Sequence, residues 1–149
     1  MRYLILVSHG TFAPGLHNAL GMMAGSDRED IRSTSLLDGM DVDTFRANFT
    51  ELVGDITAED EIILTADIIG GSPLTTALDV LTEKGLLAHT LAIGGMKPPP
   101  VPPGYSPLVL TAAFADADTP LEELEQELTG EAKDQIKRFD LGGDEDDDI

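Results

Sequence analysis

Residues 61–85, EIILTADIIGGSPLTTALDVLTEKG, contain a buried strand, a glycine turn and a helix in direct succession. The apolar run of residues 61–67 is typical of a strand that is covered on both faces. Ser72 is expected to cap the helix, with Pro73 at its first position and Gly85 just beyond its end. A strand followed by a helix in this way is the repeating unit of a parallel α/β sheet.

The rest of the first 95 residues repeats this alternation of apolar strands and amphipathic helices. We expect further strands at residues 3–7, 31–37 and 87–95, and further helices at residues 13–24 and 41–56. Parallel strands that are joined through helices by right-handed crossovers bury both faces of their sheet. The sequence therefore predicts an α/β fold, a three-layer sandwich around a mainly parallel sheet with the strand order 2-1-3-4.

Charge and composition exclude several classes of function. The 149-residue chain carries 28 acidic and nine basic side chains, a formal net charge of -19, so we expect no nucleic-acid or membrane-surface partner. It contains no cysteine, which removes disulfides, thiolate catalysis and Cys-ligated metals. The first apolar run is too short for a signal peptide, and no run reaches the roughly 18 residues of a membrane span. We therefore expect a cytoplasmic protein without membrane insertion.

The last third of the chain has a different composition. Six of residues 97–107 are prolines, which predicts an exposed, polyproline-like loop that joins no sheet. Helices are expected at residues 108–117 and 119–130, and a short edge strand at residues 136–141. The terminal acidic run predicts disorder over residues 142–149. We therefore expect one domain over residues 1–141 with a Pro-rich loop, followed by a disordered acidic tail.

Two polar side chains stand at the carboxyl ends of strands that the predicted order makes neighbours. His9 follows the apolar residues 3–7, and Asp67 ends the run of residues 61–67. Ligands of open parallel sheets bind beyond these strand ends, so the two side chains can meet there. A carboxylate that accepts from one imidazole nitrogen fixes the tautomer and leaves the other nitrogen with the lone pair of a nucleophile.

The glycine turn provides a second feature of the same rim. Gly70 and Gly71 let the backbone approach a ligand, and the first-turn amides with the Ser72 hydroxyl would receive an oxyanion such as phosphate. Each feature alone has an ordinary structural explanation, as a turn residue or a helix cap. Their joint placement predicts phosphoryl transfer through a phosphohistidine with no metal at the centre. His17, inside a helix, and His89, early in a strand, are left out of the site.

The sequence resembles the IIA component of the mannose-type (mannose/fructose/sorbose) phosphoenolpyruvate-dependent sugar phosphotransferase system in two motifs, ILVSHGTFAPGLHNAL at residues 5–20 and DIIGGSPLTTAL at residues 67–78. The resemblance implies a transferase without a cofactor, in which His9 accepts a phosphoryl group from the phosphocarrier protein HPr. The group would pass to the IIB component during sugar uptake. The resemblance also implies that Asp67 orients the histidine and that Ser72 helps to hold the phosphoryl group.

The resemblance also implies how the chain assembles, and one segment of the sequence differs from the family pattern. Such IIA domains form homodimers in which a C-terminal strand crosses to the partner, and QIKRFDL at residues 135–141 is the candidate for this strand. Lys97 stands where the family has an Asn after strand four, and the Pro-rich loop follows it. That loop is expected on the rim of the site. It is either a lineage-specific surface loop or an element that alters docking of HPr or IIB or recruits a proline-reading partner.

Four other functions share part of this pattern. The SHG motif is also similar to the phosphotransfer subunit of dihydroxyacetone kinase, although the GGSP run favours the sugar branch. A small tetrapyrrole metal chelatase would need a second histidine facing His9, and phosphohistidine phosphatases carry an Arg where Ser8 stands. A regulatory domain that is phosphorylated on His9 is the non-enzymatic alternative.

Overall fold

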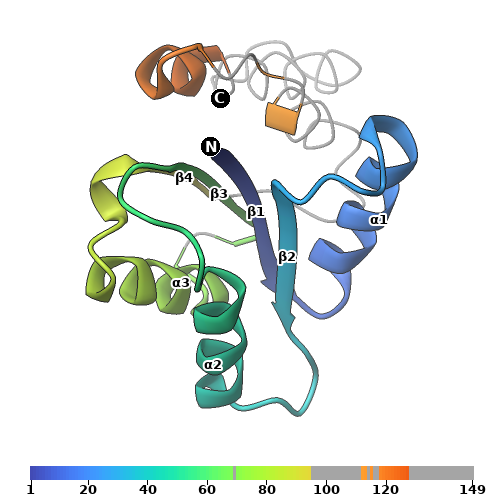
Figure 1. Ribbon diagram of the computed structural model, residues 1–149. Helices are drawn as coiled ribbons and strands as arrows, with labels where there is room; N and C mark the ends of the chain where they lie inside the picture. The colour runs from blue at the N-terminus through green and yellow to red at the C-terminus, as the bar shows by residue number, and fades with distance from the viewer. Residues whose placement is uncertain (69, 95–111, 114, 116–117, 128–149) are drawn as a thin grey trace, which may run out of the picture. The chain divides into compact units, whose positions relative to one another are not determined.

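Four parallel strands in the order β2-β1-β3-β4 form the sheet of this computed structural model (Figure 1). The structure describes residues 1–68, 70–94, 112–113, 115 and 118–127. The strands are β1 (Arg2–His9), β2 (Ile31–Leu36), β3 (Glu61–Ala66) and β4 (Thr90–Ile93). The helices are α1 (Phe12–Ala24), α2 (Val42–Leu52) and α3 (Ser72–Glu83), with a 3₁₀ turn, η1, at Leu87–His89. The predicted α/β class and the strand order 2-1-3-4 are confirmed.

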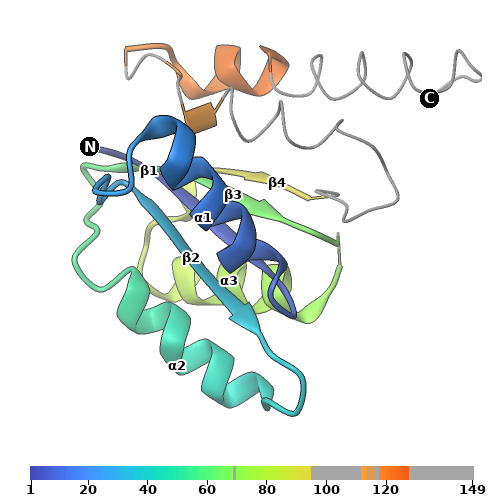
Figure 2. The same cartoon turned by 90° about the vertical axis from the view of Figure 1, so that its right-hand side faces the viewer.

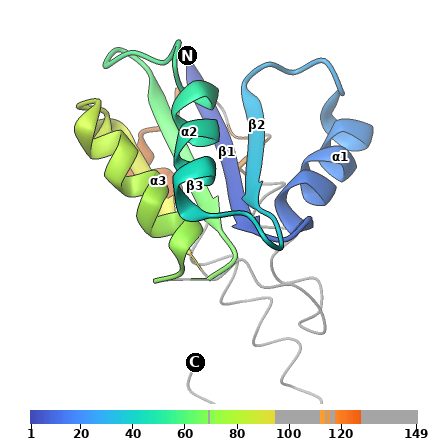
Figure 3. The ribbon, with the colours of Figure 1, turned by 90° about the horizontal axis from the view of Figure 1, so that it is seen from below.

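Helices cover both faces of the sheet and form the two outer layers of the sandwich (Figure 3). α2 and α3 share a buried apolar cluster with alternate residues of β1 and β3, in which Phe45 and Phe49 are almost fully buried. α1 lies on the opposite face, across β1 and β2 (Figure 2). Because successive side chains of a strand point to opposite faces, the continuous apolar runs of β1 and β3 supply both cores.

The end of α3 matches the expected role of Gly85. Its φ of +73° is the left-handed conformation that glycine adopts without a steric penalty. Gly85 N–H donates to the carbonyl of Thr82 (3.1 Å), and Leu86 N–H donates to that of Leu81 (2.8 Å). These two bonds form a Schellman motif, and both leucines are buried beside it.

The start of α3 differs by one residue from the prediction. Gly71, with φ −78° and ψ 160°, is the N-cap, whereas Ser72 and Pro73 are the first two helical residues. The reason is the first backbone bond of the helix, which runs from Thr75 N–H to the carbonyl of Gly71 at 3.0 Å. The cap residue is the one whose carbonyl accepts that bond. Ser72 is therefore not the N-cap.

Two other predicted boundaries were also wrong. Residues 87–95 were expected to be one strand, but Leu87–His89 form a 3₁₀ turn and only Thr90–Ile93 pair with β3. The chain is still turning there, because Thr90 Oγ1 donates to the carbonyl of Leu86 at 2.9 Å. The helix expected at residues 41–56 ends at Leu52, after which short-range bonds such as Gly54 N–H to the Glu51 carbonyl turn the chain.

The chain divides into two compact units, Met1–Met96 and Lys97–Ile149. In the second unit residues 112–113 and 121–127 are helical, within the helices expected at 108–117 and 119–130. The Pro-rich loop 97–107, the strand 135–141 and the tail 142–149 lie outside the described residues. None of the helices in the described part of the chain has the length and apolar character that crossing a bilayer requires.

Candidate functional site

His9 and Asp67 meet at the carboxyl-terminal edge of the sheet. His9 is the last residue of β1, and Asp67 follows Ala66, the last residue of β3. The two strands pair directly, with Val7 opposite Ala66, so their ends present both side chains at one place. The His9 side chain is 43% exposed, whereas that of Asp67 is only 6% exposed. A buried carboxylate therefore supports an imidazole that is accessible to solvent.

Both oxygens of the Asp67 carboxylate accept hydrogen bonds. Oδ1 accepts from the N–H of Ile68 at 2.9 Å. Oδ2 accepts from the backbone N–H of His9 at 3.0 Å and lies 3.1 Å from its ring Nδ1. An ionised carboxylate only accepts, so this contact favours the tautomer with the proton on Nδ1. In that neutral tautomer Nε2 is the nitrogen with the free lone pair.

The turn after His9 is held by two further bonds. Gly10 has a φ of +60°, and its N–H donates to the carbonyl of Leu36 on β2 at 2.9 Å. Ser8 is fully buried, and its Oγ accepts from the N–H of Ala13 at 2.7 Å. No structural role for Ser8 is evident in the sequence pattern. The available signal was a small hydroxyl residue directly after the apolar residues 3–7, on the strand face that α1 covers.

The glycine turn lies directly against the imidazole. Gly70 has a φ of +82°, and Gly71 is so close to His9 that a Cβ built on it would lie 3.0 Å from Cε1 of the ring. Ser72 follows as the first residue of α3 and is exposed. The structure therefore brings Gly71 and Asp67 into contact with His9, and it places Gly70 and Ser72 on either side of Gly71.

The amino end of α3 provides backbone donors at this rim. The first N–H groups of an α-helix have no partner within the helix, and the helix dipole adds a partial positive charge there. Pro73 at the second position has no N–H, which leaves the amides of Ser72 and Leu74 as first-turn donors. This end of the helix is suited to an anion such as phosphate.

The other two histidines lie elsewhere. Nδ1 of His17 is 2.8 Å from Oγ of Ser33, and burial lowers the pKa of His17 from its usual value. His89 lies in η1, before the amino end of β4, at the sheet edge opposite His9. Neither is the facing histidine that a chelatase would need. Within the described residues no group of three or more His, Asp or Glu side chains is arranged to hold a metal ion.

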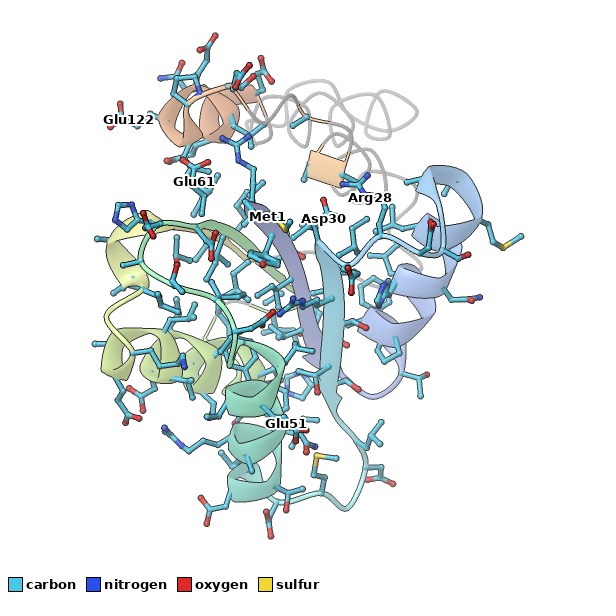
Figure 4. All side chains as sticks on the ribbon, in the orientation of Figure 1. Met1, Arg28, Asp30, Glu51, Glu61 and Glu122 are labelled. Carbon is cyan, nitrogen blue, oxygen red and sulfur yellow. The ribbon has the colours of Figure 1, made fainter. Side chains whose placement is uncertain are left out.

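Several ion pairs gather around the amino ends of the strands, away from His9 (Figure 4). The Met1 ammonium pairs with Asp60 at 2.8 Å, and Arg2 pairs with Glu61 at 2.8 Å. Arg28 donates twice to Asp30, and these hydrogen bonds lower the pKa of the Asp30 carboxyl. These cationic side chains form ion pairs at the amino ends of the strands. Beside His9, at the other end of the sheet, the partial positive charge comes from the backbone amides at the start of α3.

Comparisons with known proteins agree with this fold. A sequence model of the EIIA-man family, described as "PTS system fructose IIA component", matches residues 3–101. The fructose-specific EIIA component of the Bacillus subtilis phosphotransferase system is 28% identical over 80 residues, 54% of this chain and 54% of that protein. The match therefore spans about half the length of that curated relative.

Solved structures share the architecture over most of the chain. The EIIA component from Streptococcus agalactiae superposes with a TM-score of 0.74 at 20% identity, covering 95% of this chain and 99% of that one. The mannose/sorbose-specific IIA subunit from Enterococcus faecalis gives a TM-score of 0.70 at 19% identity, covering 89% and 90%. These two likenesses show the fold, and the family model covers both sequence motifs of the site. The chain therefore belongs to the EIIA-man family, the mannose-type IIA components of the sugar phosphotransferase system.

Proposed function

We propose that this protein carries phosphoryl groups on His9, accepting them from phospho-HPr and passing them to a IIB component during sugar uptake. The observation that carries the proposal is the 3.1 Å contact between Nδ1 of His9 and Oδ2 of Asp67. This contact favours the tautomer with the proton on Nδ1 and the lone pair on Nε2. The half-exposed imidazole is accessible to a protein donor. Membership of a phosphotransferase family supports the same chemistry.

The transfer step needs only the phosphoryl donor, His9 and Asp67, and no cofactor. The Nε2 lone pair of neutral His9 attacks phosphorus in line, so a P–N bond forms while the bond from phosphorus to the donor breaks. The donor leaves with its electron pair. The product ring is a phosphoimidazolium whose Nδ1–H remains bonded to the Asp67 carboxylate, which stabilises the positive charge that develops on the ring. Transfer to IIB reverses these steps.

The phosphoryl oxygens need donors while phosphorus changes partners. We assign this role to the Ser72 hydroxyl and to the amides of Gly70, Gly71 and Ser72 at the start of α3. The Gly71 N–H would exchange its long 3.4 Å bond to the Ile68 carbonyl for a bond to a phosphoryl oxygen. Positioning of the reacting groups and preorganised donors supply most of the rate enhancement in such a site. No metal has a part in this mechanism.

The proposed partners follow from the family. They are HPr, a IIB component and a second copy of the chain, with the C-terminal strand 135–141 as the segment proposed to cross between copies. We propose that transfer takes place in the cytoplasm, where the phosphorylated donor is available. The net charge of -19 argues against nucleic acid as a partner.

Labelling from phosphoenolpyruvate through enzyme I and HPr tests the proposal. We expect an acid-labile phosphate on the wild-type protein and on His17→Ala, a histidine control outside the site, but none on His9→Ala. Phosphate that then moves to IIB, and not to a dihydroxyacetone kinase, identifies the sugar branch. Labelled His9→Ala protein, or transfer to the kinase alone, would contradict the proposal.

A further inference from the structure

Gly70 and Gly71 are neighbours, but they are glycines for different reasons. Gly70 has a φ of +82°, a conformation that other residues rarely adopt, and a Cβ built on it would meet nothing within 4 Å. Gly71 has a φ of −78° and a ψ of 160°, which any residue can adopt. The backbone therefore demands glycine at position 70 and leaves position 71 open to a side chain.

Space is what excludes a side chain at position 71. A Cβ there would lie 3.0 Å from Cε1 of His9, 3.5 Å from Cβ of Ile68 and 3.6 Å from the Ile68 carbonyl oxygen. Ile68 is held in place by two hydrogen bonds of its own backbone. Its N–H donates to Asp67 Oδ1 at 2.9 Å, and its carbonyl accepts from the Gly71 N–H at 3.4 Å. The imidazole is the group that would have to move.

We propose that Gly71 is a positioning residue for His9, a role that rests on the proposed function and differs from any amide contact to phosphate. Cε1 is bonded to both ring nitrogens, so a contact at this atom controls the placement of both. With hydrogen alone at position 71, the ring packs against the loop while Nδ1 reaches Asp67. A methyl group there displaces the ring edge, lengthens the Nδ1–Oδ2 contact and releases the tautomer.

The test is Gly71→Ala, with Gly15→Ala as its matched control. Gly15 lies in α1, and a Cβ there meets nothing within 4 Å, so it makes the same chemical change away from the site. Side-chain ¹H–¹⁵N spectra of the unphosphorylated proteins report which ring nitrogen of His9 carries the proton, and thermal unfolding reports stability. The rate of phosphorylation by phospho-HPr is measured on the same samples.

We expect wild type and Gly15→Ala to show His9 protonated on Nδ1, and Gly71→Ala to show a mixture of Nδ1–H and Nε2–H rings at an unchanged melting temperature. Phosphorylation of Gly71→Ala should be about 10- to 100-fold slower, as expected when a reacting group is misplaced by about 1 Å. In an Asp67→Ala background, adding Gly71→Ala should slow phosphorylation no further.

Unchanged tautomer and rate in Gly71→Ala would overturn the proposal, and so would an unfolded variant, because the proposal states that the backbone accepts a Cβ. The spectra need no partner protein. If the tautomer changed in Gly71→Ala while wild type accepted no phosphate, the proposed function would be wrong and the positioning role would stand.

Discussion

Oδ2 of Asp67 binds His9 twice, through the backbone N–H at 3.0 Å and through ring Nδ1 at 3.1 Å. One oxygen thus fixes both the strand end that carries the imidazole and the orientation of the ring. The other oxygen is held by Ile68 N–H, so the carboxylate cannot turn freely. The carboxylate that joins the end of β1 to the loop after β3 therefore also orients the ring so that Nε2 can act as the nucleophile.

Asp67→Asn should slow phosphorylation of His9 by about 10²-fold or more, because the amide can donate to Nδ1 and thereby shift the proton to Nε2. A protonated Nε2 has no lone pair with which to attack. The rate of label uptake from phospho-HPr checks this, with circular dichroism as the control for folding. A rate close to that of wild type would contradict the assigned role of Asp67.

Ser8→Ala should destabilise the fold by about 1 kcal/mol, because it leaves the buried N–H of Ala13 without its acceptor. Thr82→Ala is the matched control, since it removes a hydroxyl from an exposed helical position where alanine is the better helix former. Urea unfolding of the two variants measures both effects. Equal stability of Ser8→Ala and wild type would show that the bond contributes nothing.

The glycines at positions 85 and 15 should respond in opposite directions to alanine. Gly85→Ala should cost about 1 kcal/mol of stability, because φ is +73° in the Schellman motif that ends α3. Gly15→Ala should add about 0.5–1 kcal/mol, because it lies within α1 with open space around its Cβ position. Denaturant unfolding at one pH gives both values. The same sign for both changes would refute the reasoning.

The burial of His17 predicts a pH-dependent stability. Burial lowers the pKa of His17 in the folded protein, whereas the unfolded chain keeps the usual value of about 6.5. As the pH falls below that value, His17 therefore binds a proton more readily in the unfolded chain than in the folded one. Stability from the neutral ring is thus fully present above that pH and is lost as the pH falls toward the folded pKa. The urea midpoint of unfolding is measured at a pH above 7 and at a pH near 5. Its decrease between these two pH values should be larger for wild type than for His17→Gln. An equal fall would contradict this prediction.

Much of the fold follows from local patterns in the sequence. The continuous apolar runs and the intervening amphipathic helices predict the alternation, and 2-1-3-4 is one of the common strand orders of such doubly wound sheets. The meeting of His9 and Asp67 follows from that order, because both end adjacent parallel strands. Gly85 was predicted correctly, because glycine beyond a helix is a strong conformational signal.

The remaining details depend on spatial relationships that residue types do not encode. Ser72 has the chemistry of a cap, but the first helical bond runs to the carbonyl of Gly71. Leu87 continues an apolar run, yet the turn that follows the Schellman motif removes it from β4 and leaves it exposed. The space that Gly71 leaves for the His9 ring is visible only once the β3–α3 loop and the end of β1 are placed together.

The protonation and phosphorylation of the two His9 ring nitrogens test the central claim most directly. Long-range ¹H–¹⁵N spectra of the side chain, recorded before and after incubation with phosphoenolpyruvate, enzyme I and HPr, distinguish the nitrogens. We predict a proton on Nδ1 in both states and a phosphoryl group on Nε2 after incubation. A phosphoryl group on Nδ1, or an unchanged His9 ring in a protein that has gained phosphate, would contradict the account.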